Sequence, residues 1–230
     1  MRRFLIGGHL DGTDKLSAFT ALVEERRPDA ILFTGGILGE NAVRPAQKSA
    51  TWKSFFSELG KLATFTAIVP GESDVPLRLF LRAAKDAEVA FPHLHIAHAT
   101  LFEEGDVALE GLGGELTEEE DDTNERLRYA RPSAEYFLRS LWAADQPRKI
   151  LLMSVAPKGR LGGARGNGVG GDFIDSYHPA LCAVGGVTER RGSERIAHTL
   201  IINPGRLADG SAAWLDWKRT GSPHIEMLSV

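Results

Sequence analysis

The chain has 230 residues, of which 43% are hydrophobic, and its 27 Lys and Arg residues nearly balance 31 Asp and Glu residues. This length supports one well-buried core but is short for two independent domains, so we expect a single domain over residues 1–230. The near balance of charge provides no broad basic field, which excludes nucleic acid and an anionic membrane surface as expected partners.

Cysteine usage and the N-terminal residues indicate a cytoplasmic protein. Cys182 is the only cysteine and lies in an apolar run, so no disulfide framework is expected and the composition fits a reducing compartment. The apolar run from Phe4 to Ile6 stops at Gly7 and is too short for a signal peptide or a membrane span. We therefore expect cytoplasmic localisation.

The first part of the chain contains three successive units of a strand, a glycine turn and a helix. Apolar runs at 3–6, 30–33 and 64–69 have strand length, and each one stops at a turn that contains glycine. Apolar residues at helical spacing follow each turn: Leu16, Phe19, Leu22 and Val23, then Trp52, Phe55, Phe56, Leu59 and Leu62, then Leu77, Phe80, Leu81 and Ala84. Consecutive units of this kind predict parallel strands with right-handed crossovers, and hence an α/β fold.

Residues with short oxygen-bearing side chains precede two of these helices. Thr13 or Asp14 is predicted to cap the first helix, which Pro28 ends. Asp74, before Val75 and Pro76, is predicted to cap the third helix.

Short strands dominate the rest of the chain. They are expected at 95–102, 107–112, 150–155, 181–184, 199–202, 212–217 and 225–228. The acid-rich segment 113–125 is predicted to be a solvated loop, and Pro132 and Ser133 to start a helix. The glycine-rich segment from Gly159 to Gly171 is costly to order, so we expect it to be mobile or ordered by a partner.

Five turns follow expected strands in order along the chain. They are Gly7-Gly8-His9, Gly35-Gly36, Gly71-Glu72-Ser73-Asp74, Ser154 ahead of Pro157, and Gly185-Gly186-Val187-Thr188. With Asn203-Pro204-Gly205 after the last strand pair, this order resembles that of the calcineurin-like metallophosphoesterases. The resemblance implies a sandwich of two facing mixed β-sheets flanked by α-helices, with αββα layers.

The resemblance also implies that most metal ligands of that family are replaced here. Its members carry Asp-x-His, Gly-Asp, Gly-Asn-His-Asp, a later His, and Gly-His-x-His at these turns. The matching remnant site in this chain consists of Gly7, His9, Gly36, Glu72, Ser73, Asp74, Ser154, Gly186 and Thr188. The acid-rich run followed by R-L-R-Y-A-R-P-S-A-E-Y-F-L-R-S-L-W also resembles small bacterial members of the family whose metal motifs are eroded.

Two neighbouring divalent cations need anionic bridging ligands and several imidazoles before a bound water becomes a hydroxide. We therefore expect no metal cofactor, with His9 and Glu72 as weak candidates for a single divalent ion. Structural roles also remain open for the retained residues. His9 fits a hydrogen bond to its own turn, and Asp74 fits a helix cap.

Two further patterns favour structural roles. Ser73 and Ser154 have no His and acid patterned around them, so no catalytic residue is assigned. His93, His95 and His98 lie close together, but no further Cys or His cluster completes a zinc site, which favours an edge strand.

Anion binding without a metal is the positive alternative. Glycine turns at strand ends expose backbone N–H groups, and four arginines lie in or beside the loops around these turns: Arg160, Arg165, Arg190 and Arg206. These groups fit a small phosphate-bearing or carboxylate ligand.

Two functions follow from these patterns. The first is a metallophosphoesterase-like pseudoenzyme that acts as a ligand-binding or interaction module, with a protein partner or an oligomer as further possibilities. The alternative is a phosphoesterase, acting on phosphomonoesters or phosphodiesters, with an altered site or a single metal held by His9 and Glu72.

Overall fold

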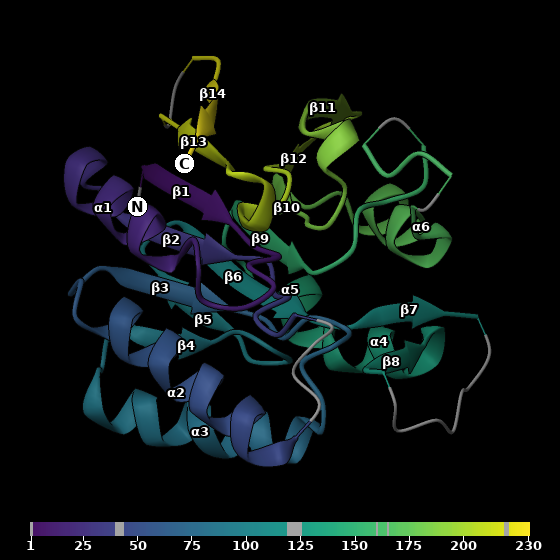
Figure 1. Cartoon of the computed structure of the whole chain (residues 1–230). Helices are drawn as coiled ribbons and strands as arrows, with labels where there is room; N and C mark the ends of the chain where they lie inside the picture. The colour runs from purple at the N-terminus through teal and green to yellow at the C-terminus, as the bar shows by residue number, and fades with distance from the viewer. Residues whose placement is uncertain (1, 40–43, 119–125, 160, 165, 219–220) are drawn as a thin grey trace.

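Two six-stranded mixed sheets pack face to face and helices cover their outer faces (Figure 1). The structure is a computed structural model that describes residues 2–39, 44–118, 126–159, 161–164, 166–218 and 221–230. Within these residues the order of the first sheet is β14-β13-β1-β2-β3-β4, and the order of the second is β11-β12-β10-β9-β6-β5. The expected αββα sandwich is confirmed.

The elements of the first sheet and of its helical cover come mostly from the first part of the chain. The strands are β1 (Arg3–Gly7), β2 (Ala30–Phe33), β3 (Phe65–Ile68), β4 (Leu94–Ile96), β13 (Ser211–Asp216) and β14 (His224–Ser229), and the helices are α1 (Leu16–Arg26), α2 (Pro45–Gly60) and α3 (Leu77–Ala90). Strands β1 to β4 are parallel, as the strand, turn and helix units predict.

The second sheet and its cover come from the middle and the C-terminal part. The strands are β5 (Phe102–Glu104), β6 (Val107–Leu112), β9 (Arg148–Met153), β10 (Leu181–Ala183), β11 (Gly192–Ile196) and β12 (Thr199–Asn203), and the helices are α4 (Arg131–Phe137), α5 (Arg139–Ala143) and α6 (Gly168–Tyr177). A small separate sheet pairs β7 (Glu115–Thr117) with β8 (Arg128–Ala130). Short 3₁₀ turns lie at η1 (Thr188–Arg190) and η2 (Leu207–Asp209).

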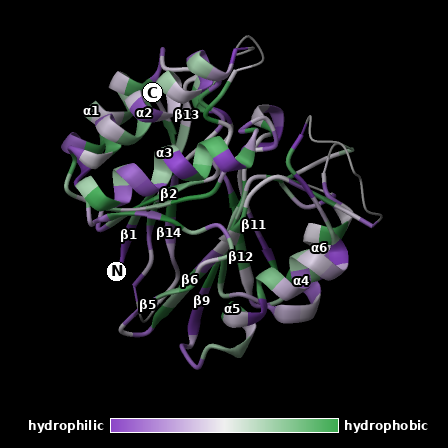
Figure 2. Ribbon diagram, turned by 90° about the horizontal axis from the view of Figure 1, so that it is seen from below, coloured by the Kyte–Doolittle hydropathy of each residue, from purple (hydrophilic) through white to green (hydrophobic). Residues whose placement is uncertain are grey.

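Strand β2 shows why the central strands are apolar along their whole length. Successive side chains of a strand point to opposite faces, and both faces of this sheet are covered. Ala30 and Leu32 therefore lie in the core between the two sheets, and Ile31 and Phe33 lie in the core under the helices. Figure 2 shows the hydrophobic strand interiors and the mixed colouring of the helices. This packing fixes the strand ends, and with them the turns.

Two sequence predictions about these elements are wrong. The predicted strand at 95–102 is divided, because the chain turns at Ala99, with φ of 51°, and passes from β4 in one sheet to β5 in the other. Strand β11 forms between the expected strands at 181–184 and 199–202, where no strand was predicted, and it is an edge strand. Leu81 lies on helix α3, as expected, and is 40% exposed.

The end of the glycine-rich segment forms helix α6 rather than a mobile loop. The Asn167 side chain accepts the N–H of Gly170 at 2.8 Å and so caps the helix. Val169, Phe173 and Ile174 are buried against the second sheet, which offsets the ordering cost of the glycines.

Helix α1 lacks the predicted side-chain cap, because Lys15 occupies the capping position and makes no such bond. In the part of the chain that the structure describes, no helix has the length and apolar content to cross a membrane.

Candidate functional site

The turns after β1, β2, β3, β9 and β10 lie around one cavity of about 350 Å³. Parallel strands deliver their carboxyl ends to the same edge, so these turns meet although they are far apart in the sequence. The residues that line the cavity are His9, Asp11, Gly36, Leu38, Glu72, Ser73, Glu115, Ser154, Val155, Ala156, Asn167, Gly185, Gly186, Val187 and Arg206. Six of the nine remnant-site residues are thus brought together.

The other three remnant-site residues lie outside this lining. Gly7 packs under helix α1, where an added Cβ would approach the Phe19 ring to 2.9 Å. The Thr188 hydroxyl donates to Asp209 at 2.5 Å. Asp74 is fully buried behind the cavity wall.

The His9 side chain is held at the inner end of the cavity. Its backbone has φ of 53°, and its N–H donates to the Gly35 carbonyl at 2.6 Å. Its Nε2 lies 3.0 Å from the Ser154 carbonyl oxygen. Because a carbonyl only accepts, Nε2 carries the hydrogen of this bond. Burial lowers the pKa of His9, so the ring is neutral near pH 7.

Glycines enclose the His9 ring closely. A Cβ added at Gly36 would lie 2.8 Å from Nδ1 of His9, and one added at Gly185 would lie 2.6 Å from Nε2. At Gly186, which has φ of 102°, a Cβ would lie 3.2 Å from the ring. The imidazole fills the space that side chains at these positions would need. A carboxylate at position 36 or an imidazole at position 186 therefore requires His9 to move.

Asp74 binds the turns together and does not cap helix α3. The N-cap of that helix is Pro76, without a side-chain bond. The Asp74 carboxylate accepts five N–H bonds, from the backbone of Gly36, Ile37, Leu38 and Gly71 at 2.7 to 3.2 Å and from the Trp52 indole at 3.1 Å. Burial raises the pKa of Asp74, and the donors act in the opposite direction. The N–H groups expected to bind an external anion at these two turns are therefore directed at an internal carboxylate.

Each carboxylate in the cavity lining has an arginine partner. Glu72 lies 3.5 Å from Arg126. Glu115 accepts from Arg128 at 2.8 Å, and Asp11 accepts from Arg206. These ion pairs link the cavity to the β7–β8 sheet on one side and to the turn after β12 on the other.

The four predicted anion-binding arginines do not converge. Arg206 lines the cavity, paired with Asp11. Arg190 is exposed and is not part of the lining, and its Nε would lie 3.3 Å from a Cβ at Gly163. Arg160 and Arg165 lie outside the described residues.

Sequence reasoning missed three polar residues of the lining, namely Asp11, Glu115 and Asn167. Asp11 was detectable in principle, because it follows His9 by two residues at the same turn and precedes a glycine. Glu115 and Asn167 lie in segments whose local pattern predicts only a loop, and tertiary packing brings them to the cavity.

The remaining candidate ligands are separated from one another. His93 bonds the Gly60 carbonyl through Nε2 at 2.7 Å, and His98 contacts Tyr129 at 2.9 Å and the Gly113 N–H at 3.0 Å. Cys182 is buried, which raises the pKa of its thiol. Among the residues that the structure describes, no group of three or more His, Cys, Asp or Glu side chains is arranged to hold a metal ion.

Comparisons with known proteins agree with this architecture. The family model for metallophosphoesterases of the calcineurin superfamily matches residues 2–223. One crystal structure is 28% identical with a TM-score of 0.89, and the match covers 99% of both chains. The crystal structure of TT1561 from Thermus thermophilus is 27% identical with a TM-score of 0.85, covering 99% of this chain and 98% of that one.

A dimetal phosphatase from Danio rerio shares the fold at lower identity. It is 9% identical, with a TM-score of 0.72, and the match covers 99% of this chain and 96% of that one. No curated protein matches the chain.

Proposed function

The chain belongs to the calcineurin superfamily of metallophosphoesterases, and from this premise we propose that it is a member without two-metal phosphoesterase activity that acts as a ligand-binding or interaction module. The observation that carries the proposal is the His9 ring, which is bonded to the Ser154 carbonyl and enclosed by Gly36, Gly185 and Gly186. A two-metal site would need metal-ligating side chains at the positions that this ring and these glycines occupy.

The donor set supports the same conclusion. Two neighbouring divalent ions need carboxylate bridges that offset their repulsion, and imidazoles that complete their shells. Here Asp74 is committed to five N–H donors, and the carboxylates of Asp11, Glu72 and Glu115 each have an arginine partner. His9 is the only imidazole in the described lining. These residues do not fit a two-metal centre.

The expected ligand is a small phosphate-bearing or carboxylate compound. A cavity of about 350 Å³ falls within the roughly 300–1,000 Å³ usual for small-molecule sites. Arg206 supplies the cationic group, and its guanidinium already holds an internal carboxylate, Asp11. In the proposed complex, an external phosphate or carboxylate group takes the place of Asp11 on the Arg206 guanidinium.

Metal content and turnover test the loss of hydrolysis. The purified protein is dialysed with manganese, analysed for bound metal, and assayed on p-nitrophenyl phosphate and bis-p-nitrophenyl phosphate. We expect substoichiometric metal and no turnover above that of the His9→Ala variant. Stoichiometric metal together with turnover that His9→Ala abolishes, and that the exposed control His198→Ala keeps, would contradict the proposal.

Anion binding is tested separately with inorganic phosphate. Removing the internal competitor in Asp11→Asn is expected to tighten phosphate binding about fivefold, the factor that ~1 kcal/mol supplies. Asp14→Asn, an exposed acid in the same loop, serves as the matched control and should leave the affinity unchanged. Equal affinities in the two variants and the parent protein would exclude Arg206 as the anion site.

The rival function is a phosphoesterase with a single metal or an altered site. It has one observation in its favour, since His9, Asp11 and Glu72 line the same cavity. A metal ion there requires Asp11 and Glu72 to leave their arginine partners. The turnover assay above separates the two functions, because the rival predicts metal-dependent hydrolysis that His9→Ala removes.

A further inference from the structure

A second cavity, of about 260 Å³, lies between the open edges of the two sheets. Strand β4 ends the order of the first sheet and β5 ends that of the second. The lining residues are Phe65, His95, Phe102, Glu103, Glu104, Val107 and Leu109. Phe65 and Val107 begin strands β3 and β6, so this cavity is at the opposite end of those strands from the glycine turns.

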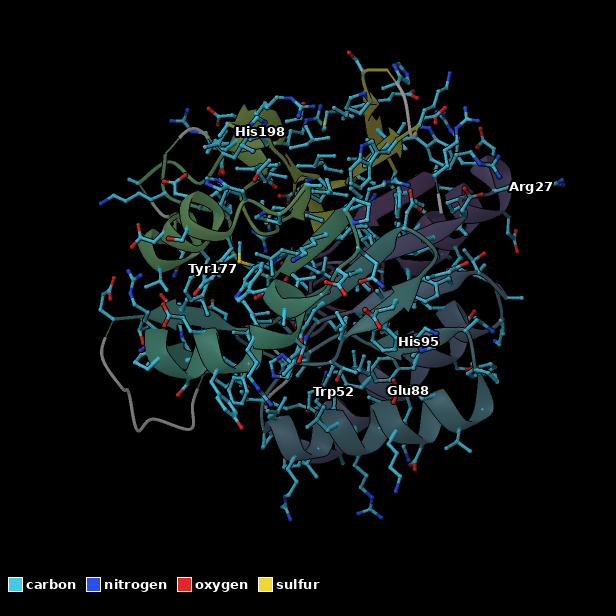
Figure 3. All side chains as sticks on the ribbon, turned by 180° about the vertical axis from the view of Figure 1, so that it is seen from behind. Arg27, Trp52, Glu88, His95, Tyr177 and His198 are labelled. Atoms are coloured by element: carbon cyan, nitrogen blue, oxygen red, sulfur yellow. The ribbon has the colours of Figure 1, made fainter. Side chains whose placement is uncertain are left out.

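Three aromatic rings form one wall of this cavity. The His95 ring lies 4.8 Å from Phe65 and 4.7 Å from Phe102, measured between ring centroids. The two phenyl rings are 6.4 Å apart and meet at 79°, so they form a corner that the imidazole fills. Burial lowers the pKa of His95, which keeps this ring neutral near pH 7. Figure 3 labels His95 near Glu88 of α3, whose carboxylate accepts the N–H of Ile96 at 2.8 Å.

Two carboxylates complete the lining beside these rings. Glu103 and Glu104 are exposed, and neither carboxylate has an ion-pair or hydrogen-bond partner within the described part of the chain. In the cavity of about 350 Å³ at the glycine turns, by contrast, each carboxylate of the lining has an arginine partner. The second cavity therefore combines aromatic side chains with two carboxylates that are not ion-paired within the residues that the structure describes.

An adjoining cavity of about 530 Å³ shares Phe65 and Glu104 with this one. In it the Arg148 guanidinium lies 4.0 Å from the centroid of the Trp217 ring. A cation on an aromatic face is thus already part of the packing at this end of the molecule.

We propose that the cavity formed by Phe65, His95 and Phe102 with Glu103 and Glu104 is a binding site for a small organic cation of the alkylated-ammonium class. The negative faces of aromatic rings attract such a cation, and its alkyl groups pack against the apolar side chains of the lining, which a strongly hydrated ion does not do. The carboxylates add Coulomb attraction. The volume is slightly below the roughly 300–1,000 Å³ usual for small-molecule pockets, which fits a compact ligand.

Choline and its uncharged isostere 3,3-dimethylbutan-1-ol test this assignment. Both have the same shape, so titration calorimetry at constant ionic strength isolates the contribution of the charge. We expect choline to bind with millimolar affinity and the isostere to bind at least fivefold more weakly, as cation–π energies of ~1 kcal/mol imply. Equal binding of the two compounds, or no binding of choline, would overturn the proposal.

Variants place the binding at this cavity. Phe102→Leu keeps an apolar side chain but removes a π face, and Glu104→Gln removes a charge without changing size. Each is expected to weaken choline binding about threefold to tenfold. Glu25→Gln, an exposed acid on helix α1, is the charge-matched control and should have no effect. Choline binding that survives both cavity variants unchanged would place it elsewhere and contradict the assignment.

Discussion

Within the described residues, the carboxylates at one end of the sandwich are paired within the chain, and those at the other end are not. At the glycine turns Asp74 binds five N–H groups, and the acids of the lining are held by arginines. At the open edges Glu103 and Glu104 lie beside three aromatic rings without a partner among the described residues. On our proposals, a ligand at the first end displaces Asp11 from Arg206, whereas the carboxylates at the second end have no partner in the described part of the chain to give up. The carboxylates at the glycine turns are therefore already paired within the chain, and those at the open edges are not paired with any residue that the structure describes.

Replacing Asp74 is expected to have the largest effect, because it tests whether the first end depends on its internal carboxylate. Asp74→Ala leaves four backbone N–H groups and one indole N–H buried without an acceptor, at about 1–3 kcal/mol for each group that water cannot reach. We expect a loss of ~4 kcal/mol or more in the free energy of unfolding, measured by urea denaturation. The exposed control Asp86→Ala should lose less than ~0.5 kcal/mol. A similar small loss for both variants would show that the turns hold without this carboxylate.

The next effect concerns the pH dependence of stability that comes from His98, which contacts Tyr129 and accepts the Gly113 N–H. Burial lowers the pKa of His98 to about 4, so the folded state binds its proton less readily than the unfolded state, in which the pKa is about 6.5. The stability this gives is complete above about pH 6.5 and is lost as the pH falls, by ~3 kcal/mol at pH 4. Denaturation curves across this range should show the loss, and His98→Gln should flatten it. An unchanged pH slope in that variant would assign the effect to other groups.

A smaller effect tests the contact between His9 and its glycines. The Cβ of Gly185→Ala would approach His9 Nε2 to 2.6 Å and the Thr34 hydroxyl to 2.5 Å, so we expect a destabilisation of ~2 kcal/mol. His9→Ala removes one of these two clashes. The double variant should therefore be more stable than the sum of the single effects by ~1 kcal/mol.

Gly168→Ala is the matched control for this cycle, since a Cβ there has no atom within 4 Å. It should change stability by less than ~0.5 kcal/mol. Strict additivity of the His9 and Gly185 variants would mean that the ring does not occupy this space in solution.

Periodicity and turn residues predicted the sheets well, but they predicted the site only in part. Strand β2 is visible in the sequence because four consecutive apolar residues between Asp29 and Thr34 have few alternatives. The role of Asp74 is not visible, since its donors come from the turn after β2 and from helix α2, more than twenty residues away, as well as from its own turn. The helix-capping pattern predicted that Asp74 caps helix α3, whereas in the structure it binds the N–H groups of two turns.

Helix α6 and Asp11 show the same limit. Glycine content predicted a segment that is mobile or ordered by a partner, yet one cap and three buried side chains order it at α6 within the chain itself. Asp11 itself is visible at its turn, but its partner Arg206 is 195 residues away and no local signal pairs the two. Burial and long-range pairing decided these cases, and neither can be read from spacing along the chain.

The central claim is that the His9 ring and its glycines occupy the cavity at the glycine turns in place of two bound cations. The most direct test is anomalous diffraction from crystals grown with excess manganese. The account predicts no pair of neighbouring manganese peaks in this cavity, with His9 Nε2 bonded to the Ser154 carbonyl. Two strong peaks about 4 Å apart, the usual spacing of two-metal sites, with His9 turned to bind one of them, would contradict it.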